Sequence, residues 1–406
     1  MRYFLSILTM WCCVTMFAQR HIIYSDDIAS LSVVAGTRWQ DLPIIKLGGN
    51  ETINIDFDEL SHTYRRLTYS IKHLDADFTE SETLFTSDYL SGFQNGLTID
   101  NYEQSINTVQ NYTHYKLQIP NRYCRLTMSG NYRLDITDND NGDDLLFSVF
   151  FMVNEDKANI ALNYTADTDI DTRKNHQQVE VIVDYSKLGA TSPNEQIKGY
   201  VLQNNRWDNA ISLPTASRLN QQYMEWTHCR NLIFDAGNEY HKFEILDVHL
   251  NSMNVEENYW DGEEWHTSLW PDYERHSYVY DETANGAFYI RNSDNSEKDI
   301  TSEYVNVHFY LKTQKQPYPI YVNGMWTNDW LTDNFLMTYN DEAGRYELTL
   351  PLKYGYYSYQ YLCVDDKGRS LIPTSEGSFY ETRNRYNVLI YYRGNADRTD
   401  RLVGVK

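Results

Sequence analysis

Hydrophobic and polar residues alternate with a period of two along much of the chain, which is typical of β-strands with one buried face. The alternation is clearest at 53–57, 66–71, 115–119 and 132–136. A continuous apolar run, LLFSVFFMV at 145–153, predicts a strand buried on both faces. Further strands are expected at 178–184, 197–203, 243–248, 286–290 and 305–311. Many short strands at regular spacing predict an all-β fold of tandem immunoglobulin-like β-sandwiches.

Breaks in this pattern divide the chain into four predicted segments. Residues 1–18 have the layout of a secretory signal peptide, with Arg2 before an apolar run from Tyr3 to Val14 and a cleavage site expected after Ala18. The first sandwich is expected over 19–153, because the polar run NEDK ends the long apolar strand there. A second β-rich domain is expected over 154–300, and a third, immunoglobulin-like and early-set-like, over 301–406.

Charge and composition narrow the possible partners. The chain has 57 Asp and Glu against 35 Lys and Arg, a formal net charge of -22, which argues against binding nucleic acid or an anionic lipid surface. Its mean hydropathy is -0.61, and no run after the leader reaches the roughly 20 apolar residues that span a bilayer. The 35 tyrosines favour strands and hydrated recognition surfaces. We therefore expect an exported protein with no nucleic-acid partner and no transmembrane segment.

Motifs for catalysis or metal binding are missing from the sequence. Removal of the leader leaves Cys124, Cys229 and Cys363, which we expect to be buried small residues, since no C-x2-C pair is present. The sequence has no H-E-x-x-H zinc motif and no G-x-S-x-G nucleophile elbow. The acidic run 138–144 invites a calcium interpretation, but Gly142 stands where a calcium loop needs an acid, which favours a solvated hairpin tip. The prediction is a protein that is not an enzyme and has no catalytic residue, metal ligand or cofactor.

Two tryptophans in the last third of the chain are the candidate binding residues. Trp326 and Trp330 stand in NGMWTNDW and are followed by the tyrosine-rich segment GYYSYQY at 355–361. This order is similar to that of starch- and glycogen-binding immunoglobulin-like domains, in which aromatic faces stack on sugars. The alternative is that Trp326 anchors the sandwich core and the tyrosines are ordinary strand residues. The sequence leaves both interpretations open.

A second resemblance covers more of the chain, most clearly residues 27–250. It rests on an ordered series of segments: VAGTRWQDLPIIKLG at 34–48, YSIKHLDADF at 69–78, SDYLSGF at 87–93, NYTHY at 111–115, SGNY at 129–132, QNNRWDN at 203–209 and GNEY at 237–240. In these segments the chain resembles the plug protein family of the type 9 secretion system.

The resemblance implies a mechanical function. A family member is periplasmic, associates peripherally with the outer membrane, and seals the periplasmic mouth of the outer-membrane translocon β-barrel that exports folded cargo. The resemblance transfers no catalytic residue and assigns no barrel contact, although the loops between His73 and Phe93 are suggested as a place for it. The alternative function is an exported glycan-binding protein that uses Trp326 and Trp330 in its C-terminal domain. A hydrolase is a third possibility, for which the sequence singles out no carboxylate pair.

Overall fold

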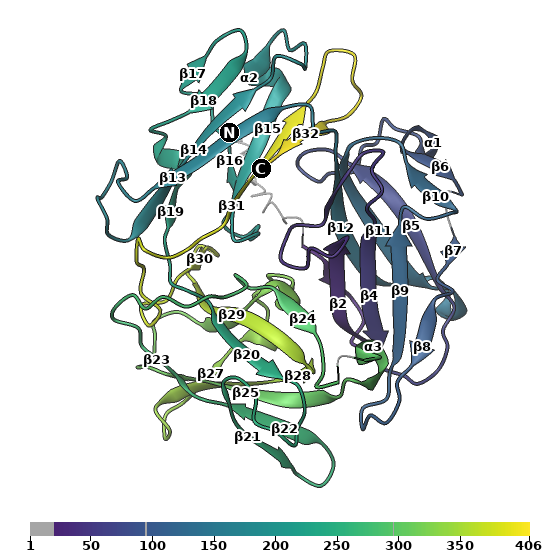
Figure 1. Ribbon diagram of the computed structural model, residues 1–406, viewed down its shortest axis with the longest axis vertical. Coiled ribbons are helices and arrows are strands. Elements are labelled where there is room, and N and C mark those ends of the chain that lie inside the picture. The colour runs from purple at the N-terminus through teal and green to yellow at the C-terminus, as the bar shows by residue number, and fades with distance from the viewer. Residues whose placement is uncertain (1–19, 94–95, 295) are drawn as a thin grey trace, which may run out of the picture.

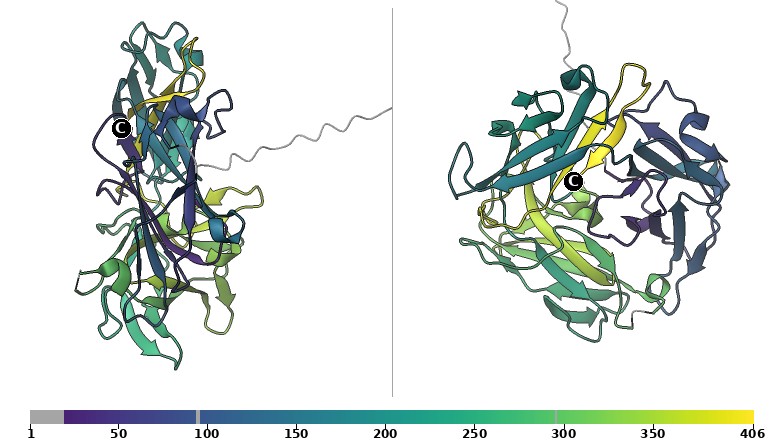
Figure 2. Two further views of the ribbon diagram at one scale, coloured as in Figure 1. Left: turned by 90° about the vertical axis from the view of Figure 1, so that its right-hand side faces the viewer. Right: turned by 45° about the horizontal axis from the view of Figure 1, so that its top comes forward.

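The computed structural model describes residues 20–93, 96–294 and 296–406. The predicted signal peptide, Met1 to Ala18, lies outside the described residues. Three β-sandwiches surround a common centre and form a flattened, three-lobed body (Figures 1 and 2). The described helices are short: α1 (Thr86–Tyr89), α2 (Pro193–Gln196), α3 (Lys298–Thr301), and 3-10 turns at Asn139–Asn141, Arg230–Leu232, Met325–Thr327 and Asp333–Phe335. This confirms the predicted all-β fold of tandem sandwiches.

The first sandwich packs a six-stranded sheet against a four-stranded one. The larger sheet has the order β1 (Ile22–Ile23), β12 (Asp144–Asn154), β11 (Gly130–Asp138), β5 (Leu67–Leu74), β7 (Leu97–Thr98), with β3 (Ile44–Lys46) parallel to β12. The smaller has the order β2 (Ile28–Ala35), β4 (Ile53–Glu59), β9 (Thr113–Ile119), β8 (Tyr102–Gln104). Beside them β6 (Leu90–Gly92) pairs with β10 (Cys124–Leu126).

Strand β12 is buried on both faces, as its continuous apolar sequence predicts. On one face Phe147 and Phe151 join the core of the first sandwich, where Phe147 packs edge-on against Phe57 at a ring separation of 4.7 Å. On the other face Met152 joins a second apolar cluster with Tyr391 and Leu402 from the C-terminal end of the chain. The strand therefore belongs to two cores, and this explains why its sequence lacks the usual alternation.

The second sandwich is completed by the end of the chain. One sheet has the order β13 (Asn159–Thr165), β14 (His176–Asp184), β18 (Tyr223–Trp226), β17 (Arg218–Leu219), with β19 (Ile233–Asp235) also on β14. The other has the order β16 (Ile211–Ser212), β15 (Ile197–Gln203), β31 (Tyr386–Tyr392), β32 (Arg401–Val405). Strand β31 pairs with β15 along its whole length.

The third sandwich is inserted between β19 and β31 of the second. One sheet centres on β29 (Gly355–Val364), which pairs with β20 (His241–Ile245), β24 (Phe288–Ile290), β26 (Ile320–Asn323) and β30 (Ser370–Leu371). The other has the order β21 (Val255–Trp260), β22 (Trp265–Leu269), β25 (Tyr304–Lys312), β28 (Arg345–Lys353), β27 (Thr338–Asn340), with β23 (Asp272–Tyr273) on β25. The predicted boundary at 300/301 does not coincide with this arrangement, because strands before and after it share one core.

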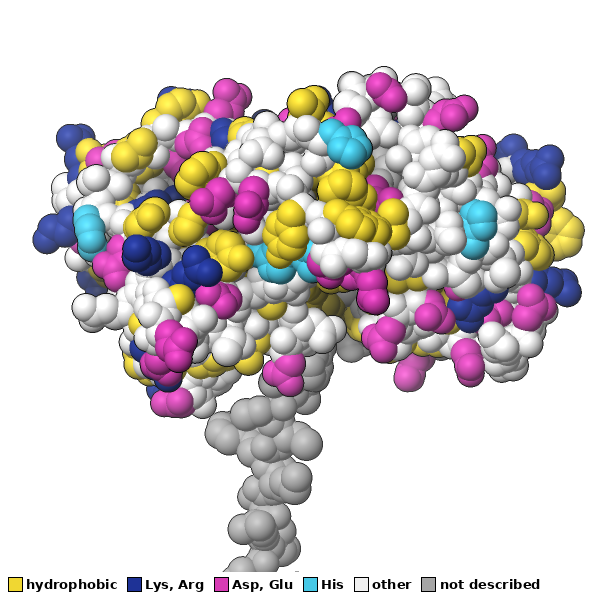
Figure 3. Space-filling view, turned by 90° about the horizontal axis from the view of Figure 1, so that it is seen from below, with side chains coloured by type: hydrophobic (Ala, Val, Ile, Leu, Met, Phe, Trp, Pro, Cys, Tyr) yellow, Lys and Arg dark blue, Asp and Glu magenta, His cyan; other side chains and the backbone are white. Residues whose placement is uncertain are grey.

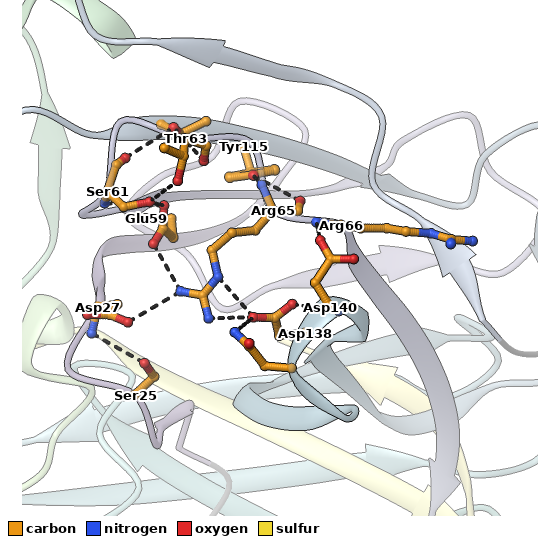
Figure 4. Close-up of polar contacts among 12 residues, drawn as sticks. Ser25, Asp27, Glu59, Ser61, Thr63, Arg65, Arg66, Tyr115, Asp138 and Asp140 are labelled. Atoms are coloured by element: carbon orange, nitrogen blue, oxygen red, sulfur yellow. Dashed lines mark hydrogen bonds and ion pairs between the residues drawn. The ribbon is translucent and has the colours of Figure 1, made fainter.

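Arg65 cross-links the two sheets of the first sandwich at one end (Figure 4). Its guanidinium donates to the Asp138 carboxylate at 2.9 and 2.5 Å, and to Glu59 at 3.0 Å. Glu59 ends β4 in one sheet and Asp138 ends β11 in the other, and both are buried. Burial alone raises the pKa of Asp138, but hydrogen bonds from Arg65, the Asp140 N–H and Asn141 outweigh it and lower that pKa below its ordinary value. Asp138 is thus a structural anchor and not part of a solvated hairpin tip.

Replacement of Arg65 by alanine is expected to destabilise the protein by about 3 kcal/mol, because it leaves two buried carboxylates without their cation. The value lies at the low end for a buried pair since Arg65 keeps some contact with solvent. Arg66→Ala is the control, because the Arg66 side chain is exposed. The hydrogen bond from Arg66 to Asp140 comes from the backbone N–H, which the substitution keeps. Urea denaturation followed by tryptophan fluorescence measures both variants. Equal stability of the two would show that the cross-link is unimportant.

Candidate functional site: the junction of the three sandwiches

The Asp58 carboxylate joins the first sandwich to the third. Asp58, near the end of β4, is fully buried and accepts hydrogen bonds from Lys353 Nζ at 2.7 Å and Tyr304 Oη at 2.6 Å, both from the third sandwich. Its other oxygen accepts from Nδ1 of His114 on β9 at 2.6 Å. Lys353 is also buried, and its ammonium lies 4.0 Å from the centre of the Tyr112 ring. A buried ion pair with every oxygen occupied fixes the relative position of the two sandwiches.

The loop between β8 and β9 docks on the third sandwich beside this pair. The Ile106 N–H donates to the Ile300 carbonyl at 2.8 Å, and the Tyr112 hydroxyl donates to the Ser302 carbonyl at 2.8 Å. The Glu303 carboxylate accepts from the backbone N–H groups of residues 109 and 110 at 2.5 and 3.2 Å. These are directional bonds to backbone groups, so they also set the register of the contact.

A second carboxylate, Asp75, joins the first sandwich to the second. It accepts from the Thr399 hydroxyl, from Ser81 Oγ at 3.0 Å and from the Asp400 N–H at 3.2 Å. Burial by itself raises the pKa of Asp75, but these hydrogen bonds and the charge of Arg393 outweigh it and lower that pKa. The apolar cluster around Met152 and Tyr391 lies beside them.

This contact uses the first part of the segment that the resemblance suggested for barrel contact. His73 is buried, where Nδ1 lies 3.0 Å from Ser81 Oγ and Nε2 lies 3.0 Å from the Ser129 carbonyl oxygen. Within 73–83, Asp75 and Ser81 therefore face the second sandwich, whereas five residues of the range are exposed: Asp77, Thr79, Glu80, Glu82 and Thr83. Phe85 and Phe93, farther along, are exposed.

All three sandwiches meet at a small cavity of about 60 Å³. Arg206 and Asp208 of the second sandwich form a buried, bidentate ion pair here, with Nε–Oδ1 and Nη2–Oδ2 distances of 3.0 and 2.5 Å. Ser370 donates to Asp208 as well. Asp329 of the third sandwich lies close by, and burial, together with the charge of Asp208, raises its pKa. The centre of the molecule thus combines a mostly apolar cavity lining with a buried ion pair beside it.

Trp326 and Trp330 lie in different surroundings, and neither stands free on the surface. Trp326 packs against the core of the third sandwich, parallel to Phe309 at 6.1 Å and edge-on to Tyr357 at 5.6 Å, and its Nε1–H donates to the Ser358 carbonyl at 3.0 Å. Trp330 Nε1–H donates to the His21 carbonyl at 2.8 Å, and the Arg20 guanidinium lies over its ring. The first indole serves the core and the second holds the N-terminal segment.

An aromatic–histidine face covers the outer side of the β21–β22–β25–β28 sheet. It comprises Tyr259, His266, His308 and Tyr310, with the Arg345 guanidinium 3.9 Å from the centre of the Tyr310 ring. Figure 3 looks at the molecule from this side, where hydrophobic and histidine side chains are interspersed with acidic ones.

The two histidines of this face are joined edge to edge. His266 Nδ1 and His308 Nε2 are 2.9 Å apart, and the rings are parallel within 12° with centres 5.1 Å apart. The Asp261 carboxylate accepts a hydrogen bond from His266 Nε2 at 3.0 Å. The proton of a neutral His266 is therefore on Nε2, and Nδ1 is the acceptor. Burial and the neighbouring His266 lower the pKa of His308. The pair is therefore ordered by hydrogen bonds.

The residues that hold the junction carried no signal in the sequence. Asp58, Asp75 and Lys353 stand in strands or turns among many other charged residues. Only the burial of a charge distinguishes them, and burial depends on contacts between segments that are hundreds of residues apart in the chain. The segments quoted for the family resemblance do include His73, Asp75 and His114.

Replacement of Lys353 by methionine is expected to cost about 3–5 kcal/mol, because Asp58 then stays buried without its counter-ion. Lys116→Met is the matched control, since Lys116 forms a similar pair with Asp299 at 2.7 Å but both side chains keep solvent contact, so its loss should cost less than about 1 kcal/mol. Urea denaturation gives both values. Limited proteolysis at the loop 105–112 is expected to speed up in Lys353→Met and not in the control.

Replacement of Asp329 by asparagine is expected to stabilise the protein at pH 7. The pKa of Asp329 is raised in the folded protein, so the folded state holds this proton more tightly than the unfolded chain. This contribution to stability is present below the ordinary carboxyl pKa of about 4 and is lost as the pH rises through the raised value. The asparagine variant should gain on the order of 1 kcal/mol at pH 7 and lose that part of the pH dependence. Thermal unfolding between pH 4 and 7.5 measures both, and an unchanged profile contradicts the assignment.

Comparison with known proteins agrees with the architecture. Residues 28–155 match the family model of the type 9 secretion system plug protein 1st domain. A crystal structure of a hypothetical protein from Parabacteroides merdae is 37% identical in sequence and superposes with a TM-score of 0.91, covering 95% of this chain and 98% of that chain. No curated protein matches. In the described ranges, no helix has the length and apolar character to cross a membrane. The first sandwich therefore belongs to the type 9 secretion system plug protein 1st domain family, and the whole chain shares its fold with the Parabacteroides merdae protein.

Proposed function

We propose that the protein is a non-enzymatic periplasmic plug that seals the periplasmic mouth of the outer-membrane type 9 translocon barrel. Family membership connects it with type 9 secretion, with a structural role and with the cell envelope. The finer role, closure of the barrel, is supported by one observation above the others. Buried charged contacts join the first sandwich to the third through Asp58 and to the second through Asp75, so that the three lobes form one body.

A plug of a wide pore must resist deformation, because a chain of loosely tethered domains would pass through one at a time. The flattened shape presents a broad face for its mass (Figure 2). The insertion of the third sandwich into the second gives that pair two chain connections, at 235–241 and 371–386. Shape and cross-links together provide a rigid cover.

We propose that the aromatic–histidine face is the surface that meets the barrel. Tyr259 is 39% exposed there, and the acidic residues Glu257 and Asp261 lie next to it on the same strand and in the turn that follows. Amphipathic rings next to charges are typical of hydrated interfaces that form and release, which a plug requires when cargo arrives. Phe85 and Phe93 form a second exposed site on the first sandwich, without the ordered ring array.

One experiment tests both the plug function and the proposed contact surface. The tagged protein is affinity-purified from detergent-solubilised envelopes and its partners are identified by mass spectrometry. A very large outer-membrane barrel is expected in near-equal amount. The variant Tyr259→Ser should reduce the recovered barrel at least fivefold, whereas Phe85→Ser, which also removes one exposed ring, should leave it unchanged. Absence of any barrel with the unaltered protein would overturn the plug function, and the reverse order of the two variants would overturn only the choice of surface.

A further inference from the structure

A cleft separates the first and third sandwiches beside the Asp58–Lys353 pair. It measures about 430 Å³, within the roughly 300–1,000 Å³ that ligand pockets occupy. Its walls come from β2 and β4 of the first sandwich and from β24 and α3 of the third. Strands β2 and β24 are edge strands of their sheets and lie on the facing sides of these two lobes (Figure 1).

His114 presents an unpartnered nitrogen at this cleft. The side chain is 6% exposed, and its Nδ1 lies 2.6 Å from an Asp58 carboxylate oxygen. Nε2 is buried and makes no hydrogen bond to any described residue; the nearest carboxylate oxygen, on Asp299, is 4.0 Å away. A buried polar nitrogen without a partner is costly, so a group that forms a hydrogen bond with Nε2 is expected to bind here.

Acceptors line the same wall. The carboxylates of Asp56 and Asp299 face the cleft, together with the side chains of Asn54, Ser30 and Ser32. Asp299 is held in place by Lys116 at 2.7 Å. Burial raises the pKa of Asp56, which shows that this carboxylate lacks full compensation in the protein alone. Such a wall matches a ligand that is rich in hydrogen-bond donors.

Acidic and basic groups balance one another around the cleft, and aromatic side chains form an apolar part of its wall. Three carboxylates face or border it and three ammonium groups balance them: Asp56, Asp58 and Asp299 against Lys116, Lys298 and Lys353. A neutral site does not favour a cation or an anion. Trp39 and Tyr289, whose ring centres are 5.6 Å apart, and Phe288 supply the apolar wall. Several hydroxyl groups on one side and an apolar C–H face on the other are the properties of a sugar ring.

We propose that this cleft binds a neutral polyhydroxylated ligand of one or two sugar rings, with a hydroxyl hydrogen-bonded to His114 Nε2, a second hydroxyl on Asp56, and the ring face against Trp39. This site is distinct from Trp326 and Trp330, which serve the core and the N-terminal segment. It does not depend on the proposed plug function, because no residue of the aromatic–histidine face lines it.

Saturation-transfer NMR and calorimetry on the full chain, with maltose, cellobiose and N,N′-diacetylchitobiose as probes, test the proposal. At least one probe is expected to bind with a dissociation constant of 1 mM or tighter and to shift the ring resonances of His114. His114→Asn keeps a donor for Asp58 but removes the Nε2 partner, and should weaken binding at least tenfold. Asp56→Asn is a second variant of nearly unchanged shape with the same expectation, in case the first fails to fold.

Trp330→Phe is the control and should leave the affinity unchanged. No binding of any probe up to 10 mM overturns the proposal, as does binding that survives both cleft variants. A lysine-containing tripeptide serves as a cationic comparison. If it binds at the cleft and the sugars do not, the charge argument is wrong and the ligand is a cation.

Discussion

The position of the Asp58 carboxylate is the constraint on which the arrangement of the lobes depends. A buried carboxylate is unfavourable unless donors surround it, and the donors for Asp58 come from two sandwiches: Lys353 and Tyr304 from the third and His114 from the first. Separation of the sandwiches would leave an ion without partners on each side. The pair therefore adds little to the stability of either sandwich alone but strongly favours one angle between them.

Chain topology strengthens the same constraint. The third sandwich is inserted into the second, since the chain leaves at β19 and returns at β31 to complete the sheet with β15. Two chain connections restrict the motion of the second and third sandwiches relative to each other more than a single connection would. The first and second sandwiches are also in contact, and Asp75 and the cluster around Met152 join them. Each lobe is thus fixed to both others, and a closed ring of contacts resists bending better than a linear array would.

The sequence predicted the elements well and their partners poorly. The local alternation of apolar and polar residues was sufficient to predict strands β4 and β9. The apolar run at 145–153 correctly indicated a strand buried on both faces. The pairing of β31 with β15 joins residues about 190 positions apart, so it depends on tertiary packing that no local pattern records. The same reason explains Asp138: its acidic neighbours suggested a solvated tip, whereas its partner Arg65 lies in another loop. Trp326 and Trp330 look equivalent in the sequence because their spacing does not reveal which face of the turn each ring covers.

The cleft beside Asp58 is a consequence of the rigid junction and not an independent feature. Asp56 and Trp39 line it from the first sandwich and Asp299 and Tyr289 from the third, so its width is set by the angle that the Asp58–Lys353 pair fixes. A ligand that contacts both walls binds most tightly at one angle, and by linkage it must favour that angle in return. His114 connects the two directly, because its Nδ1 holds Asp58 while the residue itself lines the cleft. We therefore expect the proposed occupancy of the cleft to stiffen the contact between the first and third sandwiches through this imidazole ring.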